Sequence, residues 1–223
     1  MFAAPGSLDL PPGTVDAALG PGGTIVCLRT DSPEIVVMDS SGSTTAVWDL
    51  ERAVLPVSVA SLPDGSVLVC DAASSSVIRI TDRAETVETT AVPGGTCAIA
   101  ADGPEIWCFS PDAGAVFSIP GMQWIADAEG FRPADLSLDG RRAVLSSASG
   151  VLLIEPGLAV ELPDGPSCLA GGMIFRLDGD SLREAGGTVA PASVPGGFDR
   201  IEGHPDGRIL VWSAAGASAV LLE

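Results

Sequence analysis

The chain has 223 residues, and its 29 acidic and 11 basic residues give a formal net charge of −18. This charge repels both a nucleic-acid backbone and an anionic membrane surface, so the composition predicts neither as a partner. No uninterrupted apolar stretch approaches the roughly 20 residues that span a bilayer. We therefore expect one soluble domain, because the length is sufficient for a single all-β unit with a substantial core.

The N-terminal sequence MFAAPGSLDLPPG lacks the basic start and the apolar segment of a signal peptide. The cysteines are odd in number, stand inside apolar runs and form no Cys-x-x-Cys pair; they are Cys27, Cys70, Cys97, Cys108 and Cys168. This usage is typical of reduced thiols in a protein core. The sequence therefore predicts a cytoplasmic location and five free thiols.

A short repeat runs through the chain, in which an Asp-Gly or Gly-Gly turn precedes an apolar run. The six copies are PGGTIVCL, PDGSVLVC, ADGPEIWC, LDGRRAVL, AGGMIFRL and PDGRILVW. The turn glycines that align are Gly22, Gly65, Gly103, Gly140, Gly172 and Gly207, at intervals of 32 to 43 residues. This interval is close to the length of one four-stranded blade of a β-propeller.

Each repeat predicts four strands in chain order. The residues before the turn are small, as in VASLPDG and AIAADG, which suits an innermost strand because a propeller narrows toward its axis. The turn favours a tight hairpin, because glycine adopts positive φ at little steric cost. The apolar run after it suits a middle strand packed on both faces. A polar break, a third strand and a weaker fourth segment follow.

Prolines mark the crossings between successive blades, where a missing backbone donor is tolerated; they are Pro56, Pro93, Pro133, Pro163 and Pro195. The last repeat has no fourth strand of its own. Residues 7–10 are expected to supply it and to close the ring, which leaves no free sheet edge. The sequence thus predicts an all-β, six-bladed β-propeller over residues 1–223 with almost no helix. The predicted blades are 14–55, 56–92, 93–132, 133–162, 163–194, and 195–223 together with 1–12.

The repeats LPDGSVLVCDAASSSVIRI and HPDGRILVWSAAGASAVLLE resemble those of the NHL-type propellers and of their lactonase-like and strictosidine-synthase-like relatives. The resemblance covers most of the chain and implies the fold. It does not specify an activity, because propellers include enzymes, lectins and scaffolds. Similarity to the lactonase-like members implies a divalent cation, such as calcium, held on the axis by carboxylate and asparagine side chains.

Asparagine is absent from this chain, so a cation would depend on carboxylates at or beside the predicted inner strands: Asp16, Asp135, Asp199 and Glu202. The alternative is that these acids are solvated and line a wet axial channel. The only histidine, His204, stands beside a turn, where a histidine is usually just exposed. A catalytic cysteine–histidine pair with Cys27 is conceivable, but Cys27 is predicted to lie in a buried middle strand, where a thiol is inert. The sequence predicts no catalytic residue.

Large apolar side chains gather around the outer strand of the third predicted blade, with one further tryptophan on the first: Phe117, Met122, Trp124, Ile125, Phe131 and Trp48. Aromatic and methionine side chains are enriched at the centres of interfaces, so these residues are candidates for a protein-docking patch. The alternative is that Trp124, Ile125 and Trp48 pack between blades.

The sequence favours a non-catalytic protein-interaction or scaffold module without a cofactor, an accessory subunit of a larger bacterial or phage assembly. Its acidity predicts a protein partner with a basic surface. The chain is expected to be a monomer by itself or a subunit of a hetero-complex. The alternative function is that of a cation-dependent hydrolase or lactonase-like enzyme with its site on the central axis.

Overall fold

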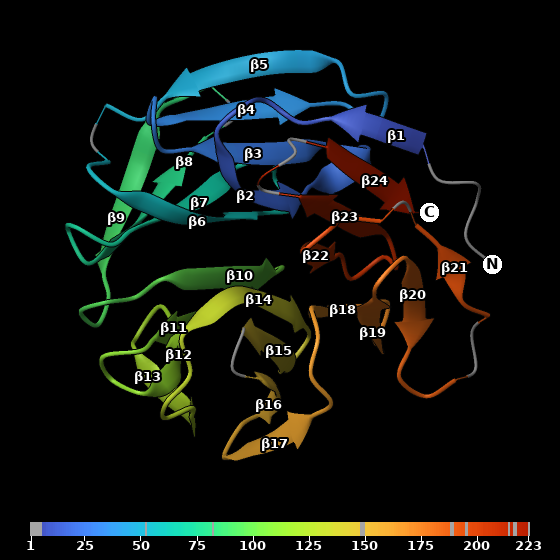
Figure 1. Ribbon diagram of the computed structural model, residues 1–223. Coiled ribbons are helices and arrows are strands. Elements are labelled where there is room, and N and C mark those ends of the chain that lie inside the picture. Colours follow the sequence, from blue (N-terminus) through green and yellow to red (C-terminus); the bar gives the residue numbers. More distant parts are fainter. Residues whose placement is uncertain are drawn as a thin grey trace.

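The computed structural model describes residues 6–51, 53–81, 83–147, 150–187, 190–194, 196–213, 215 and 218–222. Within these residues the chain forms six four-stranded antiparallel sheets arranged in a ring (Figure 1). The predicted six-bladed β-propeller is therefore confirmed. Pro195, predicted to mark a blade crossing, and residues 1–5 lie outside the described residues.

The first three blades follow one another along the chain, each running from the axis to the rim. Blade 1 comprises β2 (Thr14–Leu19), β3 (Ile25–Arg29), β4 (Glu34–Met38) and β5 (Thr44–Asp49). Blade 2 comprises β6 (Pro56–Ser61), β7 (Val67–Asp71), β8 (Ser76–Ile80) and β9 (Thr86–Ala91). Blade 3 comprises β10 (Ala98–Asp102), β11 (Glu105–Ser110), β12 (Ala115–Ile119) and β13 (Gln123–Asp127).

The remaining blades complete the ring. Blade 4 comprises β14 (Pro133–Asp139), β15 (Arg142–Ser147), β16 (Gly150–Glu155) and β17 (Leu158–Leu162). Blade 5 comprises β18 (Ser167–Ala170), β19 (Met173–Asp178), β20 (Ser181–Glu184) and the two-residue β21 (Ala192–Ser193). Blade 6 comprises β22 (Arg200–Gly203), β23 (Ile209–Ser213), β24 (Ser218–Leu222) and β1 (Gly6–Asp9).

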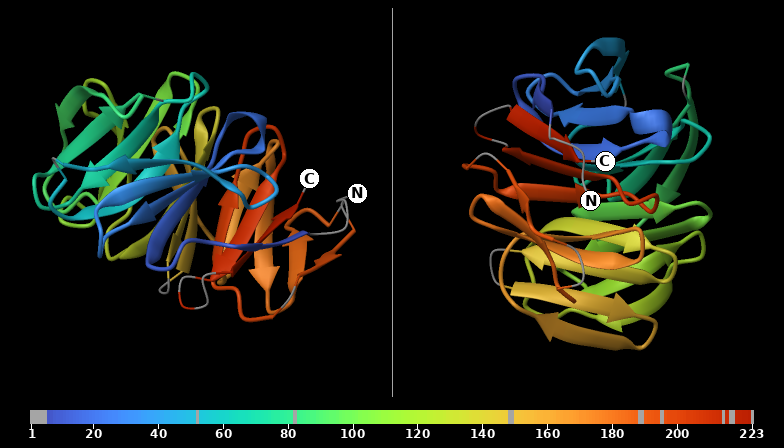
Figure 2. Two further views of the ribbon diagram at one scale, coloured as in Figure 1. Left: turned by 90° about the horizontal axis from the view of Figure 1, so that it is seen from above. Right: turned by 90° about the vertical axis from the view of Figure 1, so that its right-hand side faces the viewer.

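The N-terminal strand closes the ring, as the sequence predicts. Strand β1 pairs with β24 in antiparallel register from Gly6 opposite Leu221 to Asp9 opposite Ser218, and the two strands lie side by side in Figures 1 and 2. Leu8 and Leu10 are only 6% and 3% exposed, because both enter the core between blades 6 and 1. The first and last strands of the fold therefore share one sheet and one core.

Side chains between neighbouring blades form the core. The middle strands β7 and β23 are buried at every position, as expected for strands covered on both faces. Small residues on the inner strands, such as Ala17, Ala60 and Ala100, let these strands approach one another around the axis. In the described part of the chain the helical structure is a 3-10 turn at Pro21–Gly23, and no helix is long or apolar enough to cross a membrane.

Turns between the first and second strands of the blades lie at one end of the axis, which we call the turn face. Residues from these turns in blades 1, 2, 3 and 6 line a common pocket there. The segments that lead into each inner strand lie at the opposite end, which we call the linker face. These two faces locate the site residues described below.

Candidate functional site

Three carboxylates project from inner strands around the axis: Asp16 on β2, Asp135 on β14 and Glu202 on β22. Asp16 and Asp135 follow register shifts at the linker-face ends of their strands. Burial raises the pKa of Asp16 to about 7, with a further contribution from the charge of Asp135. Burial also raises the pKa of Glu202 well above its usual range, and both aspartates add to this effect. The three groups therefore interact electrostatically across the axis.

Asp16 has a structural role in joining two blades. Its Oδ2 accepts a hydrogen bond of 2.7 Å from the backbone N–H of Val59 in blade 2, and its Oδ1 accepts one of 3.0 Å from Ala17. Inner strands lack a paired neighbour on the axial side, so such donors need side-chain partners. Asp16 therefore satisfies a donor that would otherwise remain unpaired near the axis.

The same kind of junction recurs around the ring. Ser58 Oγ accepts a hydrogen bond from the N–H of Ile99 at 3.2 Å, which links blades 2 and 3. Ser137 Oγ lies 3.1 Å from the N–H and 3.2 Å from the carbonyl oxygen of Leu169, which links blades 4 and 5. Polar side chains of the inner strands therefore hold neighbouring blades together.

The remaining predicted metal ligands have different surroundings. Arg200 lies 3.5 Å from Asp135, and although burial raises the pKa of this carboxyl to about 6, the guanidinium opposes the rise. Asp199 is exposed. Within the described residues, no three His, Cys, Asp or Glu side chains form a group that could hold a metal ion. The axial cation therefore stays a prediction.

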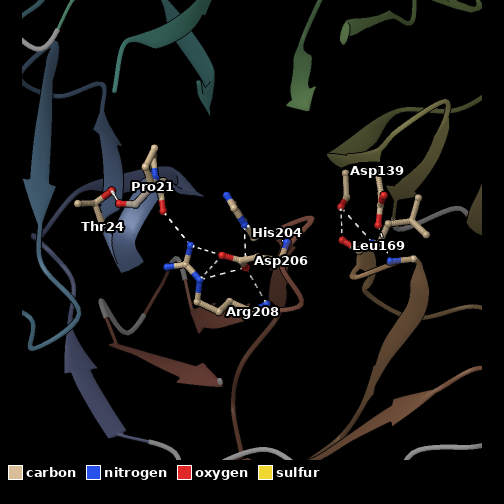
Figure 3. A network of polar contacts seen from close by, with 10 residues as sticks. Pro21, Thr24, Asp139, Leu169, His204, Asp206 and Arg208 are labelled. Atoms are coloured by element: carbon tan, nitrogen blue, oxygen red, sulfur yellow. Dashed lines mark hydrogen bonds and ion pairs between the residues drawn. The ribbon is translucent and has the colours of Figure 1, made fainter. Parts of the chain in front are cut away.

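His204 lies at the turn face within a polar network (Figure 3). Its Nδ1 is 2.8 Å from Asp206 Oδ1, and Arg208 donates to Asp206 Oδ2 at 2.6 Å and to the carbonyl of Gly20 at 3.1 Å. Burial raises the pKa of Asp206, but the hydrogen bonds from Arg208 outweigh it and lower the pKa to about 2. This network joins blade 6 to blade 1 and gives His204 a carboxylate partner.

Cys27 is not placed to form a reactive pair with His204. Its thiol is buried beside the sulfur of Met38 at 3.9 Å, and burial raises its pKa to about 12. All five cysteines are free; four are buried and Cys97 is partly exposed. The thiols therefore behave as core groups.

Two neighbouring pockets at the turn face share part of their lining. The axial pocket, of about 160 Å³, is bordered by His204 and Asp102. It shares Leu62, Pro63 and Gly103 with a larger groove of about 450 Å³ between blades 2 and 3. We call the latter the blade 2–3 groove. Its lining extends from the turn between β6 and β7 to β9 at the rim.

The blade 2–3 groove has an apolar base and a polar outer wall. Leu68 and Val77 of blade 2 face Ile106 and Ile119 of blade 3 across the base. Arg79, Glu88 and Thr90 stand on the blade 2 side, and prolines border the turns. Sequence reasoning missed this groove, because strand alternation does not indicate how far two blades diverge.

The predicted docking residues separate into two groups. Trp48 and Ile125 are each 8% exposed and pack between blades, so they are not part of an exposed patch. Phe131 is partly exposed and packs against the core between blades 3 and 4.

Phe117, Met122 and Trp124 lie together on the side of blade 3 that faces blade 2. Phe117 is opposite Trp124 in the β12–β13 pairing, and Phe117 and Met122 pack against the core between these blades. Trp124 is 51% exposed, and its indole Nε1 donates a 3.0 Å hydrogen bond to Asp127. These residues therefore share their side of blade 3 with the wall of the blade 2–3 groove.

Comparisons with solved structures agree on the architecture. The chain is 14% identical to virginiamycin B lyase from Staphylococcus aureus, with a TM-score of 0.65 over 97% of this chain and 83% of that one. It is 14% identical to XC5397, a gluconolactonase from Xanthomonas campestris, with a TM-score of 0.67 over 96% and 86% of the two chains. It is 10% identical to the β-propeller domain of Cps50 (Swd1) from Myceliophteria thermophila, with a TM-score of 0.64 over 100% and 98%.

No protein-family model matches the sequence, and no curated protein matches it. At these identities the structural neighbours show the fold alone. The neighbours include enzymes and a further propeller domain, so the β-propeller class is established while the activity is not.

Proposed function

We propose that this propeller is a non-catalytic protein-interaction module that docks an extended segment of a partner protein in the blade 2–3 groove. The observation that carries the proposal is the half-exposed Trp124 on the side of blade 3 that also forms the wall of this groove. Tryptophan is enriched among the residues that dominate binding energy.

The geometry of Trp124 supports a binding role. Its hydrogen bond to Asp127 fixes the indole in place without burying it, so little conformational entropy is lost when a partner covers the ring. Phe117 and Met122 extend the apolar surface on the same side of the blade. A partner segment would thus find an apolar groove with an aromatic anchor beside it.

The net charge favours a partner with a basic surface. An excess of 18 negative charges attracts basic proteins over long distances and raises the rate of encounter, while the apolar contacts govern dissociation. We propose that the protein is an accessory subunit of a larger cytoplasmic assembly, bacterial or phage. An acidic surface with an apolar groove is sufficient for that role. The proposed partner is therefore a protein with an apolar and basic docking segment.

A peptide library panned against the folded protein tests this function. Peptides that bind the wild type are assayed against Thr90→Trp, which fills the groove, and against Thr89→Trp, which faces blade 1 from the same strand. We expect Thr90→Trp to lower affinity at least tenfold and Thr89→Trp to leave it unchanged. Equal binding to the wild type and to Thr90→Trp would contradict the proposal.

The axial carboxylates favour a second candidate function, a hydrolase or lyase. The raised pKa values of Asp16 and Glu202 are of the kind found at catalytic centres, although structural clusters produce them too. Thermal melting with and without millimolar calcium, together with metal analysis of the purified protein, tests this candidate. A bound metal or a calcium-dependent rise in Tm that Glu202→Gln abolishes would support it; no bound metal and an unchanged Tm would remove the cation-dependent form.

A further inference from the structure

Resting on the docking function proposed above, we infer that the segment bound in the blade 2–3 groove carries an arginine or lysine that pairs with Glu88. The inference concerns the chemistry of the partner at one position of the groove. It follows from the charged side chains of the groove, because Arg79 pairs with Asp64 and leaves Glu88 without a cation among the described residues.

Two of the three charged side chains of the groove neutralise each other. Arg79 Nη2 donates a 2.6 Å hydrogen bond to Asp64 Oδ2, and Arg79 Nε donates one of 3.1 Å to Ser66 Oγ. Asp64 also accepts from Ser66, which fixes the carboxylate at the turn. Arg79 is therefore held toward the turn face of blade 2.

Glu88 is the charge that this arrangement leaves over. It stands directly opposite Arg79 in the β8–β9 pairing, yet Arg79 bonds to Asp64 instead. Among the described residues, the hydrogen-bond partner of Glu88 is the hydroxyl of Thr90 at 3.4 Å, and no cation pairs with it. The outer wall of the groove thus presents an exposed carboxylate without a counter-charge, beside an apolar base.

Charge complementarity selects the occupant. An acidic segment would bring like charges toward Glu88 and Asp64 on a chain that already carries a net charge of −18. A wholly apolar segment would cover Glu88 without compensating its lost hydration. A segment with apolar side chains toward Ile106 and Val77 and one cation at the rim satisfies both parts of the groove.

The test uses peptides whose binding is lost in Thr90→Trp. Their basic residues are replaced one at a time by norleucine, and affinity is measured for the wild type and for Glu88→Gln. Glu161→Gln on β17 is the matched control, because it removes the same charge from an exposed position on blade 4. We expect Glu88→Gln to weaken binding about threefold to fivefold and Glu161→Gln to have a much smaller effect.

A double-mutant cycle localises the pair. Replacing the critical basic residue should cost little further affinity in Glu88→Gln, and an acidic replacement in the peptide should bind Glu88→Arg better than it binds the wild type. Groove-dependent peptides that bind Glu88→Gln as tightly as the wild type would overturn the inference while leaving the docking function intact. Peptides indifferent to Thr90→Trp would instead contradict the docking function itself.

Discussion

The central axis and the blade 2–3 groove both carry carboxylates, but the two regions differ in what those carboxylates contact. On the axis, Asp16 accepts a backbone hydrogen bond from the next blade and Asp135 lies beside Arg200. In the groove, Asp64 is matched by Arg79 whereas Glu88 meets a threonine hydroxyl. Asp16 and Asp135 thus have partners within the ring, whereas Glu88 at the rim has no cation among the described residues.

This difference separates structural polar residues from candidate binding residues. A buried carboxylate that accepts a neighbouring strand's N–H completes the hydrogen bonding of the ring, so its presence is explained without a ligand. An exposed carboxylate whose hydrogen-bond partner among the described residues is a threonine hydroxyl has no such role in the fold. Variants in the two regions should therefore affect different quantities: the free energy of unfolding at the axis, and affinity at the groove.

Ring closure should have the largest effect, because β1 completes blade 6 and its leucines enter the core between blades 6 and 1. Leu8→Asp puts a charge into the core between blades 6 and 1, and we expect the free energy of unfolding to fall by about 4 kcal/mol or more. Ser7→Asp, on the exposed side of the same strand, should change it by less than about 0.5 kcal/mol. Denaturant unfolding measures both, and similar midpoints for the two variants would refute closure by β1.

Axial protonation should have the next largest effect. The pKa of Asp16 is about 7 in the folded chain and near 3.8 when unperturbed, so the folded state holds a proton between these values that the unfolded state has lost. The free energy of unfolding should therefore fall as pH rises from about 4 to 7. Asp135, with a pKa of about 6, acts in the same direction.

Asp16→Asn keeps an acceptor for Val59 and removes the titration. The wild type should lose stability between pH 4 and pH 8, whereas Asp16→Asn should not lose this contribution. The difference in free energy of unfolding, variant minus wild type, should therefore rise by about 1–3 kcal/mol from pH 4 to pH 8. Asp49→Asn, at an exposed position of β5, controls for the change in net charge. Parallel stability profiles for Asp16→Asn and the wild type would show that the axis does not carry this proton.

At the groove, Trp124→Ala should leave stability within about 1 kcal/mol of the wild type, because half of the side chain is exposed. A tryptophan packed between blades would cost about 3–5 kcal/mol. Affinity for groove-dependent peptides should fall by about 2 kcal/mol. Leu158→Ala is the matched control, since Leu158 is 52% exposed on blade 4. A normally stable Trp124→Ala variant with unchanged affinity would remove Trp124 from the site.

The smallest expected effect is the reaction of the cysteine thiols with an alkylating reagent. Burial, with a minor contribution from Asp112, raises the pKa of Cys97 to about 11, and burial raises those of the other four cysteines as well. Alkylation at pH 8 should be slow in the native protein, with the partly exposed Cys97 modified first. Rapid labelling of Cys70 or Cys108 would conflict with their burial in β7 and β11.

The repeat allowed the architecture to be predicted, because each Asp-Gly or Gly-Gly turn with its apolar run indicates one hairpin. The last blade lacks a fourth strand of its own, and the N-terminal segment was the segment left to supply it. The site was less predictable. Trp48 and Trp124 both lie on outer strands, but Trp48 packs in the core between blades 1 and 2 whereas Trp124 is exposed, and the sequence pattern does not distinguish the two. Arg79 forms its ion pair with Asp64 rather than with Glu88, which lies opposite it in the β8–β9 pairing. This preference depends on the conformation of the turn that carries Asp64, so it could not be predicted from the sequence.

The most direct test of the central claim is amide hydrogen exchange of the protein with and without a groove-dependent peptide. We expect slower exchange in β9, in β12 and around Gly103, which line the blade 2–3 groove, and unchanged exchange at the linker-face starts of β2 and β14. Protection confined to β2, β14 and β22 would contradict the account, because it would place the ligand among the axial carboxylates.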